Sequence, residues 1–373
     1  MLQRLHIVSF QLPSPPDYGG VIDVYYRIRA LKEAGVEVVL HSFCYGRRRL
    51  DDSLRQLVSE CYLYPRRIGP IAQLSSKPYI VNSRQHKRLL EDLKKDDAPI
   101  LFEGLHTCAL LAHPDLAGRV KWVRMHNVEP DYYRQLAAAC PAGFRRAYFR
   151  LEAWRLRRYE PVVEHAQRIL SVTEADAAYF AAHYPSVPVA VMHSFYDDRL
   201  SDAPRGLGGF VLYHANFEVA ENRKVADYLV REILPHSPLP LVIAGKAAAS
   251  LPSYHCSDDK LCFVSNPGKE EMATLIREAH VHLLLTFQAT GLKLKLLQAL
   301  HAGAFVLVNP AMLSGTGLEQ ACVVADGTED ICRQLGLLAE KTWSAADLQQ
   351  RQSNMALYNN TANLSVLLNL PLE

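Results

Sequence analysis

The segment FQATGLKLKLLQALHAG (287–303) lies between the apolar runs VHLLL (281–285) and FVLVN (305–309). Its composition and length indicate a helix between two buried parallel strands. Thr290 and Gly291 open this helix, and Lys293 and Lys295 fall in its first turns. Lysine is favoured at the other end of a helix, where it complements the dipole. Two lysines at the start of a helix are nevertheless favourable if a polyanion binds there, and free backbone amides at a helix start also attract an anion. The alternative is that both lysines extend into solvent.

Outward from this segment, the second half of the chain alternates strands with helices. The predicted strands are 209–215, 241–245, 261–266, 281–285, 305–309 and 322–325. The predicted helices are 220–233, 268–279, 291–302 and 328–340, followed by a helical stretch over 344–368. Such alternation is typical of a doubly wound α/β sheet.

The first half repeats the pattern. Its predicted strands are 5–10, 36–43, 99–104, 120–126, 168–172 and 187–193, and its predicted helices are 20–34, 78–95, 130–139, 143–165 and 174–183. The polar, glycine- and proline-containing stretch 196–209 is the best linker. We therefore expect an α/β protein with two Rossmann-like domains facing each other across a cleft, 1–195 and 208–343, and a C-terminal helix in 344–373 that packs back toward the first domain.

Composition narrows the class of protein. The chain has 373 residues, 49% of them hydrophobic and 21% charged, with a net charge of +2. This balance is typical of a globular protein and gives no support for nucleic-acid binding. We find neither a signal peptide nor a run of about 18 apolar residues, and so expect a cytoplasmic protein. Its 8 cysteines, without metal-like spacing, indicate reduced, mostly buried thiols.

Two other loops of the second half carry groups suited to a diphosphate. The strand 241–245 ends at Gly245-Lys246, and Asn216 follows the strand 209–215, with Asn222 near the start of the next helix. In open α/β sheets, ligands bind beyond the carboxyl ends of the strands. These residues and the 290–295 segment therefore predict a nucleotide-diphosphate pocket.

In the first half, acids and imidazoles follow the strands. Asp17, Gly19 and Gly20 form a turn after the first strand, Glu103 ends another and is followed by His106, and His126 ends a third and is followed by Glu129. Groups of this kind at strand ends suit acid–base chemistry or the recognition of sugar hydroxyls. The alternative for each is a structural hydrogen bond. The glycine turn lacks the GxGxxG dinucleotide fingerprint.

The segment 143–160 predicts a basic amphipathic helix. Its six arginines all lie in 145–158, and Phe144, Tyr148, Leu151 and Trp154 follow helical spacing. Such a helix can bind peripherally to an anionic inner membrane surface. The plainer alternative is that the apolar stripe packs on the domain and leaves an arginine face in water.

With these motifs placed, the whole chain resembles the GT-B glycosyltransferases, in particular the bacterial family-4 and family-1-like group. The matching pieces are PSPPDYGG (13–20), VRMHNVE (123–129), IAGK (243–246) and TGLKLKLLQALHAGAFVLVN (290–309). The family usually has an E-x7-E element, but this chain has Thr290 and Gln298 there, or Gln288 at the first position in another alignment. Asn216 and Asn222 stand where the family usually has arginine and lysine.

The resemblance implies a hexosyltransferase that uses a UDP- or GDP-linked sugar, without a metal or other cofactor, and a glycan or lipid-linked acceptor. The sugar donor would be held by Gly19, Gly20, Asn216, Asn222, Lys246, Thr290, Gly291, Lys293, Lys295 and Gln298. His126 would position the sugar or take the acceptor proton, with Glu103 and Asp17 as competing bases and His106 and Glu129 on the acceptor side. Without the glutamate pair, retaining or inverting stereochemistry stays open. A catalytically inactive nucleotide-binding protein and a sugar-nucleotide epimerase are the alternatives, whereas a nicotinamide-dependent oxidoreductase is disfavoured.

Overall fold

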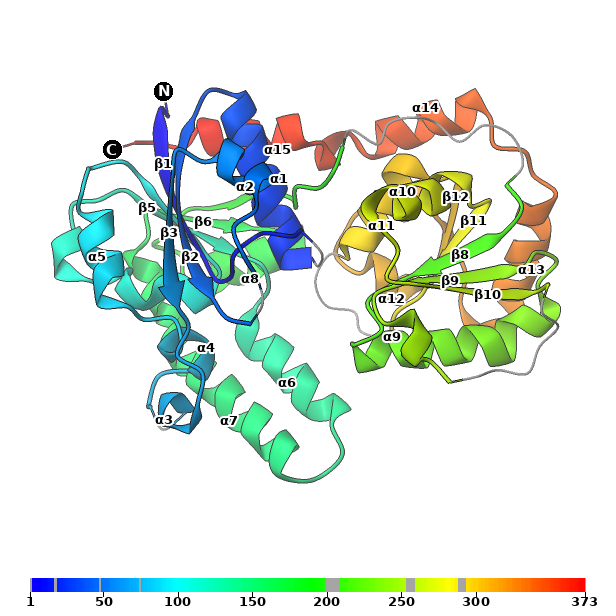
Figure 1. The fold of residues 1–373 in the computed structure, drawn as a ribbon, viewed down its shortest axis with the longest axis horizontal. Helices are drawn as coiled ribbons and strands as arrows, with labels where there is room; N and C mark the ends of the chain where they lie inside the picture. The colour runs from blue at the N-terminus through cyan, green and yellow to red at the C-terminus, as the bar shows by residue number, and fades with distance from the viewer. Residues whose placement is uncertain are drawn as a thin grey trace. The chain divides into compact units, whose positions relative to one another are not determined.

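The computed structural model describes residues 2–16, 19–46, 48–73, 75–198, 208–252, 259–287 and 293–372. The chain forms two compact units (Figure 1). Unit 1 comprises Met1–Phe195 and Asn360–Glu373, and unit 2 comprises Tyr196–Asn359. The stretch expected as one helix over 344–368 is divided into α14 (Ala345–Asn354) in unit 2 and α15 (Asn360–Leu368) in unit 1.

Unit 1 is built on a parallel seven-stranded sheet with the order β3-β2-β1-β4-β5-β6-β7. The strands are β1 (Arg4–Ser9), β2 (Glu37–Cys44), β3 (Glu60–Pro65), β4 (Ile100–Glu103), β5 (Lys121–Met125), β6 (Arg168–Ser171) and β7 (Val189–Val191). The sequence did not predict β3, because this edge strand is mostly half-buried or exposed and so lacks the apolar run typical of strands covered on both faces.

The helices of unit 1 include short 3-10 segments. They are α1 (Gly19–Glu33), α2 (Asp52–Leu57), α3 (Pro70–Gln73), α4 (Tyr79–Asn82), α5 (Lys87–Leu93), η1 (Leu105–Leu110), η2 (Pro114–Leu116), α6 (Glu129–Ala139), α7 (Phe144–Tyr159), η3 (Glu160–His165), α8 (Glu174–His183) and α15. The prediction of one helix over 78–95 was wrong, since α4 and α5 are separate. Likewise α7 ends before Pro161, which has no amide hydrogen to continue an α-helix.

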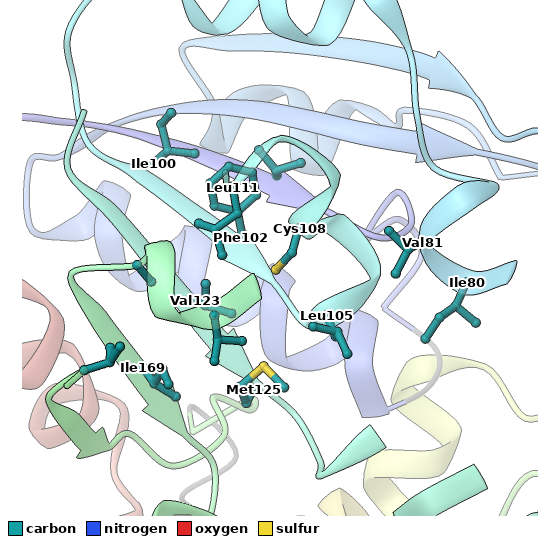
Figure 2. Packing of buried hydrophobic residues seen from close by; sticks show 14 of the residues in the cluster. Ile80, Val81, Ile100, Phe102, Leu105, Cys108, Leu111, Val123, Met125 and Ile169 are labelled. Carbon is teal, nitrogen blue, oxygen red and sulfur yellow. The ribbon is translucent and has the colours of Figure 1, made fainter. Parts of the chain in front are cut away.

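One core cluster of unit 1 lies between its sheet and the segments that follow β4 and β5. Figure 2 shows Phe102 of β4 and Val123 of β5 beside Leu105 and Cys108, which lie on the turn after β4. All four are fully buried. The apolar runs of these strands therefore pack as expected for strands covered on both faces. Of the seven cysteines that the structure describes, all free, only Cys108 is buried, so the expectation of mostly buried thiols was wrong.

Unit 2 has a parallel six-stranded sheet with the order β10-β9-β8-β11-β12-β13. The strands are β8 (Val211–His214), β9 (Leu241–Gly245), β10 (Leu261–Ser265), β11 (Val281–Leu284), β12 (Phe305–Val308) and β13 (Val323–Val324). The helices are α9 (Ala220–Tyr228), a π-helical turn η4 (Leu229–Ile233), η5 (Leu234–His236), η6 (Ala248–Ser250), α10 (Lys269–Glu278), α11 (Leu294–Ala302), α12 (Pro310–Leu313), η7 (Glu319–Ala321), α13 (Gly327–Ala339), α14 and η8 (Ala356–Tyr358).

The strand order reverses once in each sheet. In unit 1 the chain leaves β1 through β2 and β3 on one side and continues from β4 on the other; in unit 2 the reversal lies between β8 and β11. The loops after two neighbouring strands diverge at such a point, which leaves a crevice at the carboxyl edge where ligands bind in doubly wound folds. The residues after β1 and β4, and those after β8 and β11, are therefore the places to look for a site.

Candidate functional site

In unit 1, His126 and Glu103 lie together at the carboxyl edge of the sheet. Glu103 ends β4 and His126 follows β5, and the two strands pair in parallel with Glu103 opposite Arg124. His126 Nε2 is 3.0 Å from Glu103 Oε2, and His126 Nδ1 is 3.7 Å from Asp23 Oδ2. Both ring nitrogens thus face buried carboxylates. The imidazole is held in one orientation, and its exposed fraction of 15% still leaves it the accessible member of the group.

Behind His126 lies a buried network of two acids and two arginines. Arg124 Nε donates to Asp23 Oδ2 over 3.1 Å, and Arg27 bridges Asp23, at 3.4 Å, and Glu103. Asp23 Oδ1 also accepts a 2.7 Å hydrogen bond from the backbone amide of Phe195. Burial alone would raise the pKa of Asp23, but the guanidinium groups of Arg124 and Arg27 outweigh it and lower the pKa to about 2. The four charges balance, so the network fixes Glu103 and His126 without leaving a buried charge unpaired.

Close packing brings a second histidine to the same edge. Gly104 has φ +69°, and a Cβ there would lie 2.9 Å from His106 Nδ1 and 3.5 Å from His126 Cδ2. The ring of Phe10, which follows β1, lies 5.4 Å from that of His106 and 5.6 Å from that of His126. A Cβ on Gly20, at the start of α1, would approach Phe10 Cζ to 2.7 Å. Two glycines therefore permit this contact between the turn after β1 and the two imidazoles.

Glu129 supplies a carboxyl group with an unusual pKa. It lies in the first turn of α6, with Oε1 3.9 Å from His106 Nδ1. Burial raises the pKa of Glu129 to about 7 and lowers that of His106 well below its usual value. The imidazole of His106 is therefore neutral at pH 7, while Glu129 exchanges a proton near that pH. This is a property suited to proton transfer.

In unit 2, Lys293 and Lys295 lie at the start of α11. Lys293 is the N-cap residue, and Lys295 Nζ lies 4.8 Å from the centroid of the Tyr213 ring of β8. Both side chains are half-buried. Burial lowers the pKa of each lysine to about 8, although the nearby carboxylate of Glu221 acts in the opposite direction. That carboxylate accepts hydrogen bonds from the Thr286 hydroxyl and, over 3.0 Å, from the Phe287 amide.

The asparagines after β8 lie beside Tyr213, the residue whose ring Lys295 contacts. Asn222 Nδ2 donates to the Asn216 carbonyl over 2.8 Å, and the Tyr213 hydroxyl is 3.4 Å from Asn222 Oδ1. Tyr213 therefore contacts Asn222 through its hydroxyl and Lys295 through its ring. Lys246 is farther out: its ammonium pairs with Glu218 over 2.8 Å, and half of its side chain is exposed.

The structure thus groups most of the predicted residues, but in two separate sets. Unit 1 brings together Glu103, His106, His126, Glu129 and Gly20, with Gly19 beside it in α1. Unit 2 brings together Asn216, Asn222, Lys293 and Lys295, with Gln298 half-buried one turn farther along α11. The expectations for Asp17, Gln288, Thr290 and Gly291 lie outside the described residues.

Sequence reasoning missed the groups that hold these residues. Asp23 and Arg27 lie in the largely buried helix after the glycine turn, and Arg124 lies in a fully buried strand. A charged residue within a buried run must be paired, so Arg124 was a signal that an acid lies nearby. Glu221 carried no comparable signal, because an acid in the first turn of a helix is common.

Within the residues that the structure describes, no set of three or more histidine, cysteine, aspartate or glutamate side chains is arranged to hold a metal ion. In the same part of the chain, every helix is too short or too polar to cross a membrane.

Known proteins and solved structures that are similar to this chain identify its fold. No family model matches the chain. An uncharacterised 44.6 kDa protein in the cps region of Klebsiella pneumoniae is 22% identical over 342 residues, covering 85% of each chain. Among solved structures, sucrose-phosphate synthase from Thermosynechococcus elongatus has a TM-score of 0.66 at 14% identity over 98% of this chain and 97% of that one.

Two further solved structures are similar to the chain over nearly its whole length. The UDP-forming α,α-trehalose-phosphate synthase of Burkholderia xenovorans, in complex with glucose-6-phosphate, has a TM-score of 0.64 at 13% identity over 97% of both chains. Anabaena HepE, in complex with UDP and glucose, has a TM-score of 0.65 at 10% identity over 98% of both chains. Likeness at such identities concerns the fold alone. With its two parallel Rossmann-like sheets, the chain has the GT-B glycosyltransferase fold.

Proposed function

We propose that the chain is a glycosyltransferase that transfers a sugar from a UDP- or GDP-linked donor to a glycan, lipid-linked or other glycoconjugate acceptor. The fold supports this, since the similar structures include a UDP-forming synthase and a protein in complex with UDP and glucose. The cps-region relative supports a role in the assembly of a surface polysaccharide.

The observation that carries the proposal is the burial of two cations at the switch point of unit 2. Burial lowers the pKa of both Lys293 and Lys295 to about 8, so their environment disfavours the charged form. A nucleoside diphosphate beside them would supply the opposite charge and restore that form. The same contact would stabilise the diphosphate as it leaves with the electron pair of the sugar–phosphate bond.

Unit 1 supplies groups for the acceptor in this proposal. The acceptor hydroxyl oxygen forms a bond to the anomeric carbon, the bond to the diphosphate breaks, and the hydroxyl proton passes to a base. His126, oriented by Glu103 and Asp23, positions the sugar or takes that proton. Glu129, with a pKa of about 7, is the second candidate for proton transfer.

Nucleotide binding should take up protons at pH 8. Because each lysine has a pKa of about 8 in the structure, about half of each is neutral at that pH. A bound diphosphate, already ionised at pH 8, raises both pKa values, and we expect uptake of about one proton per nucleotide. Calorimetric titration with UDP or GDP in two buffers of different ionisation enthalpy measures this number.

Lys293→Ala and Lys295→Ala should each weaken nucleotide binding about 10- to 100-fold, the range for hydrogen bonds to a charged group. Each change should also reduce the proton uptake. Lys269→Ala, at an exposed lysine of unit 2, is the matched control and should bind like the unaltered protein. Equal affinity in all three variants would remove the lysines from the site.

The departure from the E-x7-E pattern favours one further candidate, a GT-B protein that binds nucleotide without turnover. Donor hydrolysis and acceptor screening separate the two: tight UDP or GDP binding with no product from any acceptor supports the binding protein. Interconversion of sugar nucleotides without an acceptor would instead identify an epimerase.

A further inference from the structure

The helix α7 exposes its largest apolar side chains. The exposed fractions are 88% for Phe144, 44% for Leu151 and 56% for Trp154. Separated by seven and three residues, these side chains lie on one face of the helix, within about 80° at about 100° per residue. They extend over about 15 Å at the helical rise of about 1.5 Å per residue. We call Phe144, Leu151 and Trp154 the apolar stripe.

A different face of α7 packs on unit 1. Glu152, Ala153 and Leu156 are buried, and Glu152 Oε2 accepts a 2.7 Å hydrogen bond from the Tyr79 amide at the start of α4. The plainer expectation, that the apolar residues of this helix pack on the domain and leave an arginine face in water, was therefore wrong for all three residues of the apolar stripe, although Tyr148 is half-buried. The helix that unit 1 holds in place by one face presents bulky apolar groups on another.

The arginines of α7 divide into two groups. Arg155 pairs with Glu152 over 2.7 Å and Arg157 with Asp131 over 3.1 Å, while Arg146 donates to the Cys140 carbonyl. The other three are exposed: Arg145, Arg150 and Arg158, of which Arg150 and Arg158 fall beside the apolar stripe at about 100° per residue. The helix carries six arginines and one glutamate, and its three exposed arginines give the free surface a positive charge.

We propose that the apolar stripe and these three arginines dock the protein on an anionic phospholipid bilayer. Guanidinium groups pair well with phosphates, and aromatic rings favour the headgroup boundary. The α6–α7 pair extends away from the sheet of unit 1 (Figure 1), which suits a projecting contact with a surface. An amphipathic helix that combines aromatic residues and leucine with arginines is typical of binding in the plane of the interface. This inference does not depend on the proposed function.

Tryptophan fluorescence gives a site-specific test. Trp154 is exposed, whereas Trp122 and Trp343 are buried, so Trp154 reports on the surface. We expect the full chain to co-float with vesicles of equal phosphatidylcholine and phosphatidylglycerol, with a blue-shifted emission. Binding to phosphatidylcholine alone should be about tenfold weaker, and high salt should weaken binding to the anionic vesicles. Failure to bind the anionic vesicles overturns the proposal.

Matched variants separate the two contributions. Phe144→Ser with Leu151→Ser should lower anionic-vesicle binding at least about tenfold, while Leu337→Ser with Leu357→Ser, at exposed leucines of unit 2, should not. Replacing Arg145, Arg150 and Arg158 by glutamine should remove the preference for anionic lipid, whereas Arg333→Gln should keep it. If the stripe variant binds vesicles like the unaltered protein, or if it only dissociates a dimer seen by light scattering, the surface does not dock on a bilayer.

Discussion

Replacing Asp23 by alanine is expected to lower the free energy of unfolding of unit 1 by about 3–5 kcal/mol, the cost of breaking a buried ion pair on one side. The Asp23 carboxylate accepts hydrogen bonds from Arg124, Arg27 and the Phe195 amide. Both arginines are fully buried, and only Arg27 keeps an acid, Glu103, once Asp23 is removed. Arg124 would retain carbonyl contacts to Met192 and His193 but, among the described residues, no carboxylate within ion-pair distance.

Urea unfolding of the full chain, followed by circular dichroism and by hydrogen exchange of β4 and β5, measures the loss. Asp97→Ala, at an exposed acid of the same unit, is the control and should change stability by no more than about 0.5 kcal/mol. Asp23→Asn should cost less than Asp23→Ala because its amide oxygen can still accept from the Phe195 amide. A loss for Asp23→Ala as small as that of the control would contradict the ion network.

Acidification from pH 7 to pH 5 should destabilise unit 2 by several kcal/mol. Burial lowers the pKa of His282 to about 3 and that of His214 well below its usual value. Since unfolded histidine titrates near pH 6.5, the stability from these neutral rings is complete above pH 6.5 and is lost as the pH falls toward the folded pKa. His282 alone accounts for a loss of about 2 kcal/mol at pH 5.

In unit 1, buried groups change the stability in both directions on acidification. Its His41 also has a pKa lowered by burial to about 3, but Glu129, with its pKa raised to about 7, acts with the opposite sign. Folded Glu129 takes up a proton as the pH falls below 7, before the unfolded group does near pH 4.5, and so stabilises unit 1 by about 2 kcal/mol at pH 5. Glu129 therefore offsets the loss from His41, while the lowered pKa values of the buried His6, His106 and His193 add a further loss of stability on acidification.

Hydrogen exchange of the full chain at both pH values resolves the two units. His282→Gln should reduce the pH dependence of unit 2 by about 2 kcal/mol, because glutamine can still donate to the Ile276 carbonyl that His282 contacts at 2.9 Å. The exposed His236→Gln serves as the control and should leave the pH dependence unchanged. An unaltered slope in His282→Gln would show that this ring does not titrate as its burial implies.

Much of the fold could be predicted from the sequence because its signals are local. The apolar runs of β5 and β11, and the helices between strands, follow from periodicities that extend over a few residues. Errors arose where a segment lacked such a pattern: the edge strand β3 is mostly half-buried or exposed, and the break between α4 and α5 falls in a stretch of helical composition.

Local sequence patterns pointed to only some of the residues of the candidate site. Glu103 and His126 were found because each follows a recognisable strand, and parallel strands end at the same edge of a sheet. Asp23, the acid that holds His126, was not found from the sequence. It also pairs with Arg124, which is 101 positions away in the chain. Likewise, no local pattern shows that Lys295 lies over the ring of Tyr213.

Local patterns in the chain were enough to predict the alternation of strands and helices in two halves, and the placement of lysines, acids and imidazoles at the ends of strands. The charges that are buried together, and the face of α7 that is left exposed, became known only from the folded molecule. The physical reason is range: backbone periodicity is set by neighbours a few residues apart, whereas burial and charge pairing depend on side chains that the strand order brings together from distant parts of the chain.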